Sequence, residues 1–187
     1  MTIDQRRRIE GGIFLVLFCL TIPAANWMIG HVGTACVVNG PCVLPVAPGI
    51  LAPSGVLMIG AALVLRDLVQ RRLGSAFGIA AILVGAVISA ALAPRALVIA
   101  STAAFLLSEF ADFAVYTPLA RRRLVLAVLA SSAVGLIVDS VIFLWLAFGS
   151  LAFLEGQVIG KAWMVLVALP LIAWLRRRDE RLGLTPA

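Results

Sequence analysis

The sequence contains little charge and few of the side chains from which most enzymes build active sites. Only 13% of its 187 residues are charged, and it has one histidine, one tyrosine and three cysteines. It lacks the phosphate loop (GxxxxGKS or GxxxxGKT) and the hydrolase motifs HExxH and GxSxG, which excludes the classes of protein that depend on them. The single histidine, His31, lies in a connecting segment, so Ser108 and Ser132 have no evident histidine partner. We expect a protein that is not an enzyme and that binds no cofactor and no metal.

Apolar residues dominate what is present. They make up 63% of the chain, and the mean hydropathy is +1.11, well above that of soluble domains. The chain carries a formal net charge of +6, but its basic residues cluster at the ends of apolar runs and form no stripe with interleaved aromatics. The sequence therefore predicts an integral membrane protein in contact with the lipid bilayer and no partnership with nucleic acid.

The apolar runs are long enough to cross a membrane. A transmembrane helix needs about 20 predominantly apolar residues, and no linker separates the runs that meet this length. We predict an all-α fold, a single transmembrane domain over residues 1–187 formed by a bundle of six transmembrane helices. The predicted spans cover about 11–29, 54–71, 75–93, 96–116, 124–149 and 157–175.

The arginines predict the orientation of this bundle. With the N-terminus inside, 13 of the 15 Lys and Arg residues fall on the cytoplasmic side, and only Arg95 and Lys161 fall toward the outside. Cytoplasmic loops carry the excess of basic residues in membrane proteins. Both termini are therefore predicted to be cytoplasmic, with the chain in a bacterial inner membrane.

The first outer connection, residues 30–53, is almost uncharged and rich in proline. Two structures suit it equally: a segment that folds back over the bundle, or an apolar loop at the membrane interface. Cys36 and Cys42 lie in this connection and could form a disulfide if the compartment is oxidising, but the sequence leaves open whether they do. A zinc site with His31 is disfavoured, because the spacing matches no familiar ligand pattern.

The fourth span carries carboxylates at membrane depth. At about 100° per residue, its polar and aromatic side chains share roughly 100° of arc. A charged side chain at the bilayer centre costs on the order of 3 kcal/mol on insertion scales, so this stripe is predicted to line a cavity or the bundle interior. Its members are Ser101, Phe105, Ser108, Glu109, Asp112 and Tyr116.

Two further charged positions belong to the same interior. Asp139 in the fifth span and Lys161 in the sixth are predicted to lie at similar depth, which makes Lys161 the natural counter-ion of Asp139, and of Glu109 through a bound ligand. Arg66 and Asp67 stand toward the inner end of the second span. There Arg66 either extends to the headgroups or forms a structural or gating ion pair.

These side chains suit a small, planar heterocycle with several N–H groups as the partner. Carboxylates accept hydrogen bonds from adjacent N–H donors, and aromatic faces stack on flat rings. Two other classes stay open. One is an intramembrane enzyme using Asp112 and Asp139, although the GxGD context of such proteases is absent. The other is an assembly protein whose charges only pair helices.

Three runs carry a family resemblance: ASTAAFLLSEFADFAVYTPL, PVAPGILAPSGVLMIGAALVLRDLVQ and GKAWMVLVALPL. Together they resemble the vitamin uptake transporter family, also described as queuosine precursor transporters, over roughly Pro45 to Leu175. The most specific part is the pattern S-E-x-x-D-x-x-V-Y, which begins at Ser108 and ends at Tyr116.

The resemblance implies a six-helix inner-membrane transporter for 7-deazaguanines such as 7-cyano- or 7-aminomethyl-7-deazaguanine. It makes Glu109 and Asp112 candidates for ligand binding, which agrees with the interpretation of the residues themselves. An alternative is the substrate-binding membrane subunit of an ATP-driven uptake system. The precursor carried, the driving force and the oligomeric state stay open, and a homo-oligomer is compatible with the sequence.

Overall fold

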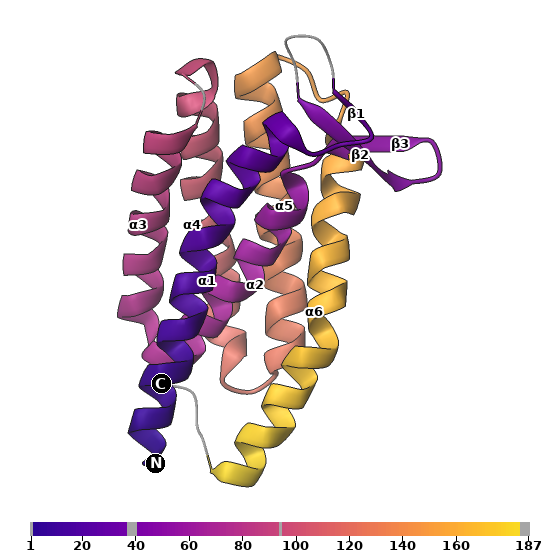
Figure 1. Cartoon of the computed structure of the whole chain (residues 1–187). Coiled ribbons are helices and arrows are strands. Elements are labelled where there is room, and N and C mark those ends of the chain that lie inside the picture. Colours follow the sequence, from indigo (N-terminus) through magenta and orange to yellow (C-terminus); the bar gives the residue numbers. More distant parts are fainter. Residues whose placement is uncertain (1, 37–40, 94, 184–187) are drawn as a thin grey trace.

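The computed structural model describes residues 2–36, 41–93 and 95–183, and its architecture is a bundle of six long helices with a small sheet at one end (Figure 1). The start of α1 and the end of α6 lie at the bottom of Figure 1, which we call the inner end, and the sheet lies at the outer end. The helices are α1 (Ile3–His31), α2 (Val56–Leu73), α3 (Ser75–Leu92), α4 (Val98–Ala120), α5 (Leu124–Phe148) and α6 (Leu154–Leu182), with a short 3-10 helix η1 (Arg95–Leu97) before α4.

Each predicted span coincides with one of these helices. Five of them, all except α2, are long and apolar enough to cross a membrane by length and composition. Helix α2 carries Arg66, Asp67, Arg71 and Arg72 within its 18 residues, which accounts for its lower apolar content. The helices are those of a multi-pass membrane protein, and six complete crossings remain a prediction.

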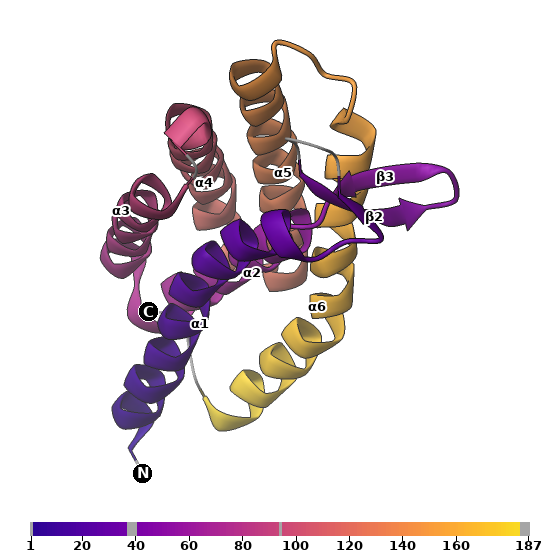
Figure 2. The same cartoon turned by 45° about the horizontal axis from the view of Figure 1, so that its top comes forward.

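Helix α2 occupies the centre of the bundle. It contacts each of the other five helices, and Figure 2 shows it enclosed by α1, α5 and α6. Neighbouring contacts join α1 to α3, α3 to α4, α4 to α5 and α5 to α6. The polar residues of α2 are therefore surrounded by protein, although α2 is the helix without an apolar stretch long enough to cross a membrane among those described.

The all-α prediction omits a three-stranded antiparallel sheet in the outer connection. Its strands are β1 (Ala35–Cys36), β2 (Cys42–Ala47) and β3 (Ile50–Pro53), and a turn with Gly49 at φ 75° joins β2 to β3. The sheet packs on α6, where the Trp163 indole donates to the carbonyl oxygen of Val46 at 2.8 Å. Cys36 and Cys42 pair across β1 and β2 and form a disulfide. The connection thus forms a sheet that packs on α1 and α6, and its depth in the membrane stays a prediction.

Polarity is inverted relative to a soluble protein. Large apolar side chains point outward, with Ile99 79% and Val167 68% exposed, whereas Arg66 and Lys161 are fully buried. Lipid tails accept an apolar exterior, but charged side chains in the hydrocarbon must be shielded and paired. The bundle accordingly places its charges between helices.

Two glycines allow these helices to approach closely. A methyl group added at Gly60 of α2 would lie 2.5 Å from the carbonyl oxygen and 2.9 Å from the Cα of Lys161. One added at Gly135 of α5 would lie 2.9 Å from Leu63 and 3.1 Å from the Cβ of Asp112. Small residues at helix interfaces let backbones come together in membranes. Gly60 therefore lets α6 approach α2, and Gly135 lets α5 approach α2 and α4.

We expect Gly60→Ala to destabilise the bundle, because the backbone of Lys161 cannot move without shifting α6. Overpacking costs about 1–3 kcal/mol and exceeds the gain of up to about 1 kcal/mol in helix propensity. The measurement is the melting temperature in detergent, followed by the fluorescence of the chain's four tryptophans.

Gly12→Ala is the matched control. A methyl group at Gly12, also inside a helix, meets nothing within 4 Å, so its melting temperature should stay equal or rise. Equal melting temperatures for the two variants would contradict the close approach of α2 and α6.

Candidate functional site

A cavity opens in the outer half of the bundle, next to the sheet. The second half of α1, the start of α2 and parts of α3 to α6 enclose it, so every long helix contributes to its wall. Most of the wall is apolar, and polar groups converge on it from five helices, α1 and α3 to α6. The polar and aromatic lining residues are Asn26, Ser89, Ser101, Phe105, Asp139, Phe143, Gln157 and Lys161.

An ion pair between α5 and α6 forms one side of this cavity. The Lys161 ammonium donates to Asp139 Oδ2 at 2.5 Å, to Ser140 Oγ at 2.7 Å and to Gln157 Oε1 at 2.8 Å. All three N–H bonds of Lys161 are thereby used. Oδ1 of Asp139 makes no hydrogen bond within the described part of the chain, and it is available to a ligand in the cavity.

A second charged group, the Arg66 centre, lies toward the inner end. We define it as Arg66 and Asp67 of α2 with Glu109 and Asp112 of α4, all of them buried. Arg66 Nε donates to Glu109 Oε2 at 3.1 Å, and Nη2 pairs with Asp67 Oδ1 at 2.9 Å and with Asp112 Oδ1. One guanidinium thus contacts three carboxylates.

Neutral groups complete the surroundings of this guanidinium. Arg66 Nη1 donates to Gln70 Oε1 at 3.0 Å, and the rings of Phe113 and Tyr116 lie 5.7 Å from the guanidinium carbon. Both rings come from α4, the helix that also supplies Glu109 and Asp112. Ser131 of α5 donates to Asp67 Oδ2 at 3.1 Å, so the Arg66 centre joins α2, α4 and α5.

The position of Arg66 corrects one of the two sequence interpretations. Its side chain does not extend to the headgroups, because it is fully buried among the carboxylates of its own helix and of α4. It lies six residues before Arg72, about 9 Å along a helix that rises 1.5 Å per residue. The ion-pair alternative is therefore the correct one.

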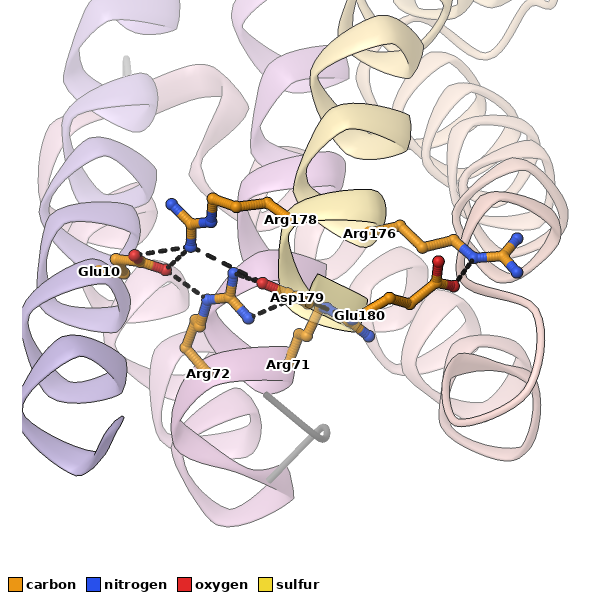
Figure 3. A network of polar contacts seen from close by, with 7 residues as sticks. All are labelled: Glu10, Arg71, Arg72, Arg176, Arg178, Asp179 and Glu180. Carbon is orange, nitrogen blue, oxygen red and sulfur yellow. Dashed lines mark hydrogen bonds and ion pairs between the residues drawn. The ribbon is translucent and has the colours of Figure 1, made fainter. Parts of the chain in front are cut away.

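A third charged network closes the inner end of the bundle, where Figure 3 shows Arg72 and Arg178 reaching toward Glu10 and Asp179. Arg71 and Arg72 of α2 both bind Asp179 of α6, with N–O distances of 2.8–3.0 Å. Glu10 of α1 pairs with Arg72 at 2.8 Å and with Arg178 at 2.6 Å. The network ties the start of α1 and the end of α6 to α2, so these two ends lie on the same side of the protein.

The predicted site residues fall into two groups. Phe105, Asp139 and Lys161 line the cavity, and the predicted pair of Asp139 with Lys161 is present. Glu109 and Asp112 are held by Arg66 instead of facing the cavity. Two others are also away from it: the Ser108 hydroxyl donates to the carbonyl oxygen of Phe105 at 3.0 Å, and Tyr116 packs in the inner part of the core.

Sequence reasoning did not include Arg66 and Asp67 in the site. The signal that could have found them is their depth, since Arg66 follows the start of α2 by ten residues and precedes Arg72 by six. The cavity residues Asn26 and Ser89 had no such signal. A single amide or hydroxyl in an apolar run is compatible with any face of a helix.

These features define a multi-pass helical membrane protein with a charged interior and a cavity in its outer half. Residues 90–175 match the family model described as "Putative vitamin uptake transporter", which confirms the resemblance for α4, α5 and most of α6. The match includes Glu109, Asp112, Asp139 and Lys161 but excludes α2. Comparison with curated proteins and with solved structures gave no match.

Removal of Lys161 alone should be more harmful than removal of the whole pair. Lys161→Met leaves Asp139 without its cation, and breaking a buried pair in this way costs about 3–5 kcal/mol. The double variant Asp139→Asn with Lys161→Met should recover most of this loss. Melting temperatures and the monodisperse fraction in size-exclusion chromatography measure both effects.

The control is Arg176→Met, which breaks a pair with Glu180 in which both side chains are about half exposed. Pairs of this kind contribute about 0–1 kcal/mol, so the melting temperature should change little. A double variant less stable than Lys161→Met would contradict the pairing of Lys161 with Asp139.

Proposed function

We propose that this protein is a bacterial inner-membrane transporter that imports a queuosine precursor, a 7-deazaguanine such as 7-cyano- or 7-aminomethyl-7-deazaguanine. The observation that carries the proposal is the cavity that Asp139 and Phe105 both line, within the segment that matches a family of uptake transporters. Glu109, Asp112, Ser108 and Tyr116 then belong to the layer beneath the ligand.

The chemistry of the lining supports a flat, nitrogen-rich ligand. A guanine-like ring presents adjacent N–H donors, which a carboxylate such as Asp139 accepts. The Gln157 amide and the Ser101 hydroxyl add donors and acceptors for ring nitrogens and the exocyclic oxygen. Phe105 offers an aromatic face, and Phe18 of α1 holds its ring at a centroid distance of 6.1 Å. A sugar would need more hydrogen-bonding partners for its hydroxyl groups than this lining provides. A lipid tail would need no polar partners at all.

The arrangement of the charges along the bundle supports uptake. The cavity lies in the outer half, next to the sheet, whereas the Arg66 centre and the inner network fill the bundle below it. A ligand in the cavity is therefore reached from the outer end. With the arginine-rich end in the cytoplasm, as the basic residues predict, this direction corresponds to import.

The ion pairs argue against the intramembrane protease. An aspartyl protease needs two carboxylates that share one site. Here Asp112 is bound by Arg66 and Asp139 by Lys161, so the two side chains belong to separate pairs.

Phe105→Leu should weaken binding of 7-deazaguanines by about tenfold, because it keeps the apolar volume but removes the stacking face. Stacking of a base on an aromatic side chain contributes about 1–3 kcal/mol, and 1.4 kcal/mol corresponds to a factor of ten. Binding is measured as thermal stabilisation of the purified protein by a panel of 7-deazaguanines, guanine and common vitamins. A ligand at 100 times its Kd adds about 2.7 kcal/mol.

Leu107→Ala is the matched control, since Leu107 lies on the same helix with 54% of its surface exposed and away from the cavity. This variant should bind like the parent protein. Thermal stabilisation by a vitamin and by no deazaguanine would agree with a transporter but would overturn the proposed substrate. Equal affinities for Phe105→Leu and the parent protein would remove the cavity as the binding site.

A further inference from the structure

The buried charges of the bundle do not balance. Arg66 is the one cation in contact with Asp67, Glu109 and Asp112 among the described residues, and all four side chains are at most 2% exposed. If every group were ionised, the Arg66 centre would carry two uncompensated negative charges in the interior of a membrane protein. An isolated buried carboxylate costs so much free energy that it takes up a proton instead.

No neighbouring cation is free to compensate this excess. Lys161 uses its three N–H bonds on Asp139, Ser140 and Gln157, and Asp139 is itself a carboxylate that faces Glu109 from α5. Arg71 and Arg72, the next cations on α2, bind Asp179 and Glu10. The buried residues of α1 and α3 in the described part of the chain include no charged side chain.

The excess of negative charge is greatest around one nitrogen atom, Nη2 of Arg66. Oδ1 of Asp67 and Oδ1 of Asp112 both contact Arg66 Nη2, so two carboxylates meet at one NH2 group of the guanidinium. Oδ2 of Asp67 receives a hydrogen bond from Ser131. Oδ2 of Asp112 is buried without a hydrogen-bond partner among the described residues, and so is the Tyr116 hydroxyl of the same helix face.

We propose that the Arg66 centre is a proton-binding site in which Asp67 and Asp112 share one proton, with Asp112 as its main carrier. Two carboxylates this close cannot both be ionised at low cost. Arg66 Nη2 contacts both aspartates, but only Asp67 also receives a hydrogen bond from Ser131, which favours its ionised form. Oδ2 of Asp112 is buried without a donor among the described residues, so Asp112 is the group that takes up the proton. The proton forms an O–H bond to Asp112, and the neighbouring Asp67 remains a carboxylate.

The site lies where it can couple proton movement to uptake, an extension that rests on the proposed function. Glu109 occupies the helical turn between Phe105, which lines the cavity, and Asp112. A proton taken from water at the outer end would bind at Asp112 and leave to water at the inner end when the bundle opens there. One proton would then enter with each molecule of ligand.

Infrared difference spectroscopy of the purified, ligand-free protein tests the proton site without any assumption about the substrate. At neutral pH we expect the C=O stretching band of a protonated carboxyl group, shifted by exchange into D2O. The band should disappear in Asp112→Asn and in Asp67→Asn, because each substitution removes one of the two carboxylates that share the proton. Asp112→Glu should restore it.

The matched control is the double variant Asp139→Asn with Lys161→Met, which removes a carboxylate together with its own cation and should leave the band intact. All variants are compared as monodisperse protein in the same detergent. Absence of the band in the parent protein, or its persistence in both Asp112→Asn and Asp67→Asn, would overturn the proposal.

Proteoliposomes containing a pH-sensitive dye test the coupling. A gradient of 7-aminomethyl-7-deazaguanine should acidify the interior with the parent protein and not with Asp112→Asn, which should still exchange internal for external ligand. Exchange without acidification in the parent protein would overturn the coupling. Failure of every 7-deazaguanine to exchange would instead contradict the proposed substrate, and the infrared band decides the proton site in either case.

Discussion

The structure depends on burying one guanidinium in the middle of a membrane protein. Arg66 is tolerated only because three carboxylates, an amide and two aromatic rings surround it. No single helix can supply such a shell, since a helix presents only residues three or four apart on one face. Helix α2 must therefore be enclosed by its neighbours. Its central position, the most unusual aspect of the bundle, follows from this requirement.

The same helix carries two charge groups that are only five residues apart. Arg66 faces the carboxylates of α4, and Arg71 and Arg72 face Asp179 of α6. Breaking either group leaves a buried ion without its partner, which is far more costly than exposing an apolar side chain. Any movement of α2 relative to α4 or α6 must therefore exchange ionic partners. Whole helices that shift as rigid bodies can exchange ionic partners while they keep their own backbone hydrogen bonds. We therefore expect such a shift and not local unfolding.

Much of this architecture could be predicted from the sequence. Apolar length predicts each helix, and similar depth predicts the pair of Asp139 with Lys161, because both follow from distances along single helices. The partners of Glu109 and Asp112 could not be predicted, since Arg66 lies 43 residues from Glu109 and the contact depends on how α2 and α4 pack. The sheet escaped prediction because proline-rich apolar residues such as Pro45 and Pro53 suit an interfacial loop equally well.

The outer sheet has a consequence for the sidedness of the molecule. Helices α1 and α6 are joined at the inner end by Glu10 and Arg178 and at the outer end by strands that contact both. A disulfide persists only where the compartment is oxidising, so the bond between Cys36 and Cys42 agrees with a sheet that lies outside the cytoplasm. It supports the orientation predicted from the arginines by a route that involves no charge. In a reducing compartment the disulfide between β1 and β2 would be broken. The sheet would then join α1 to α6 less firmly.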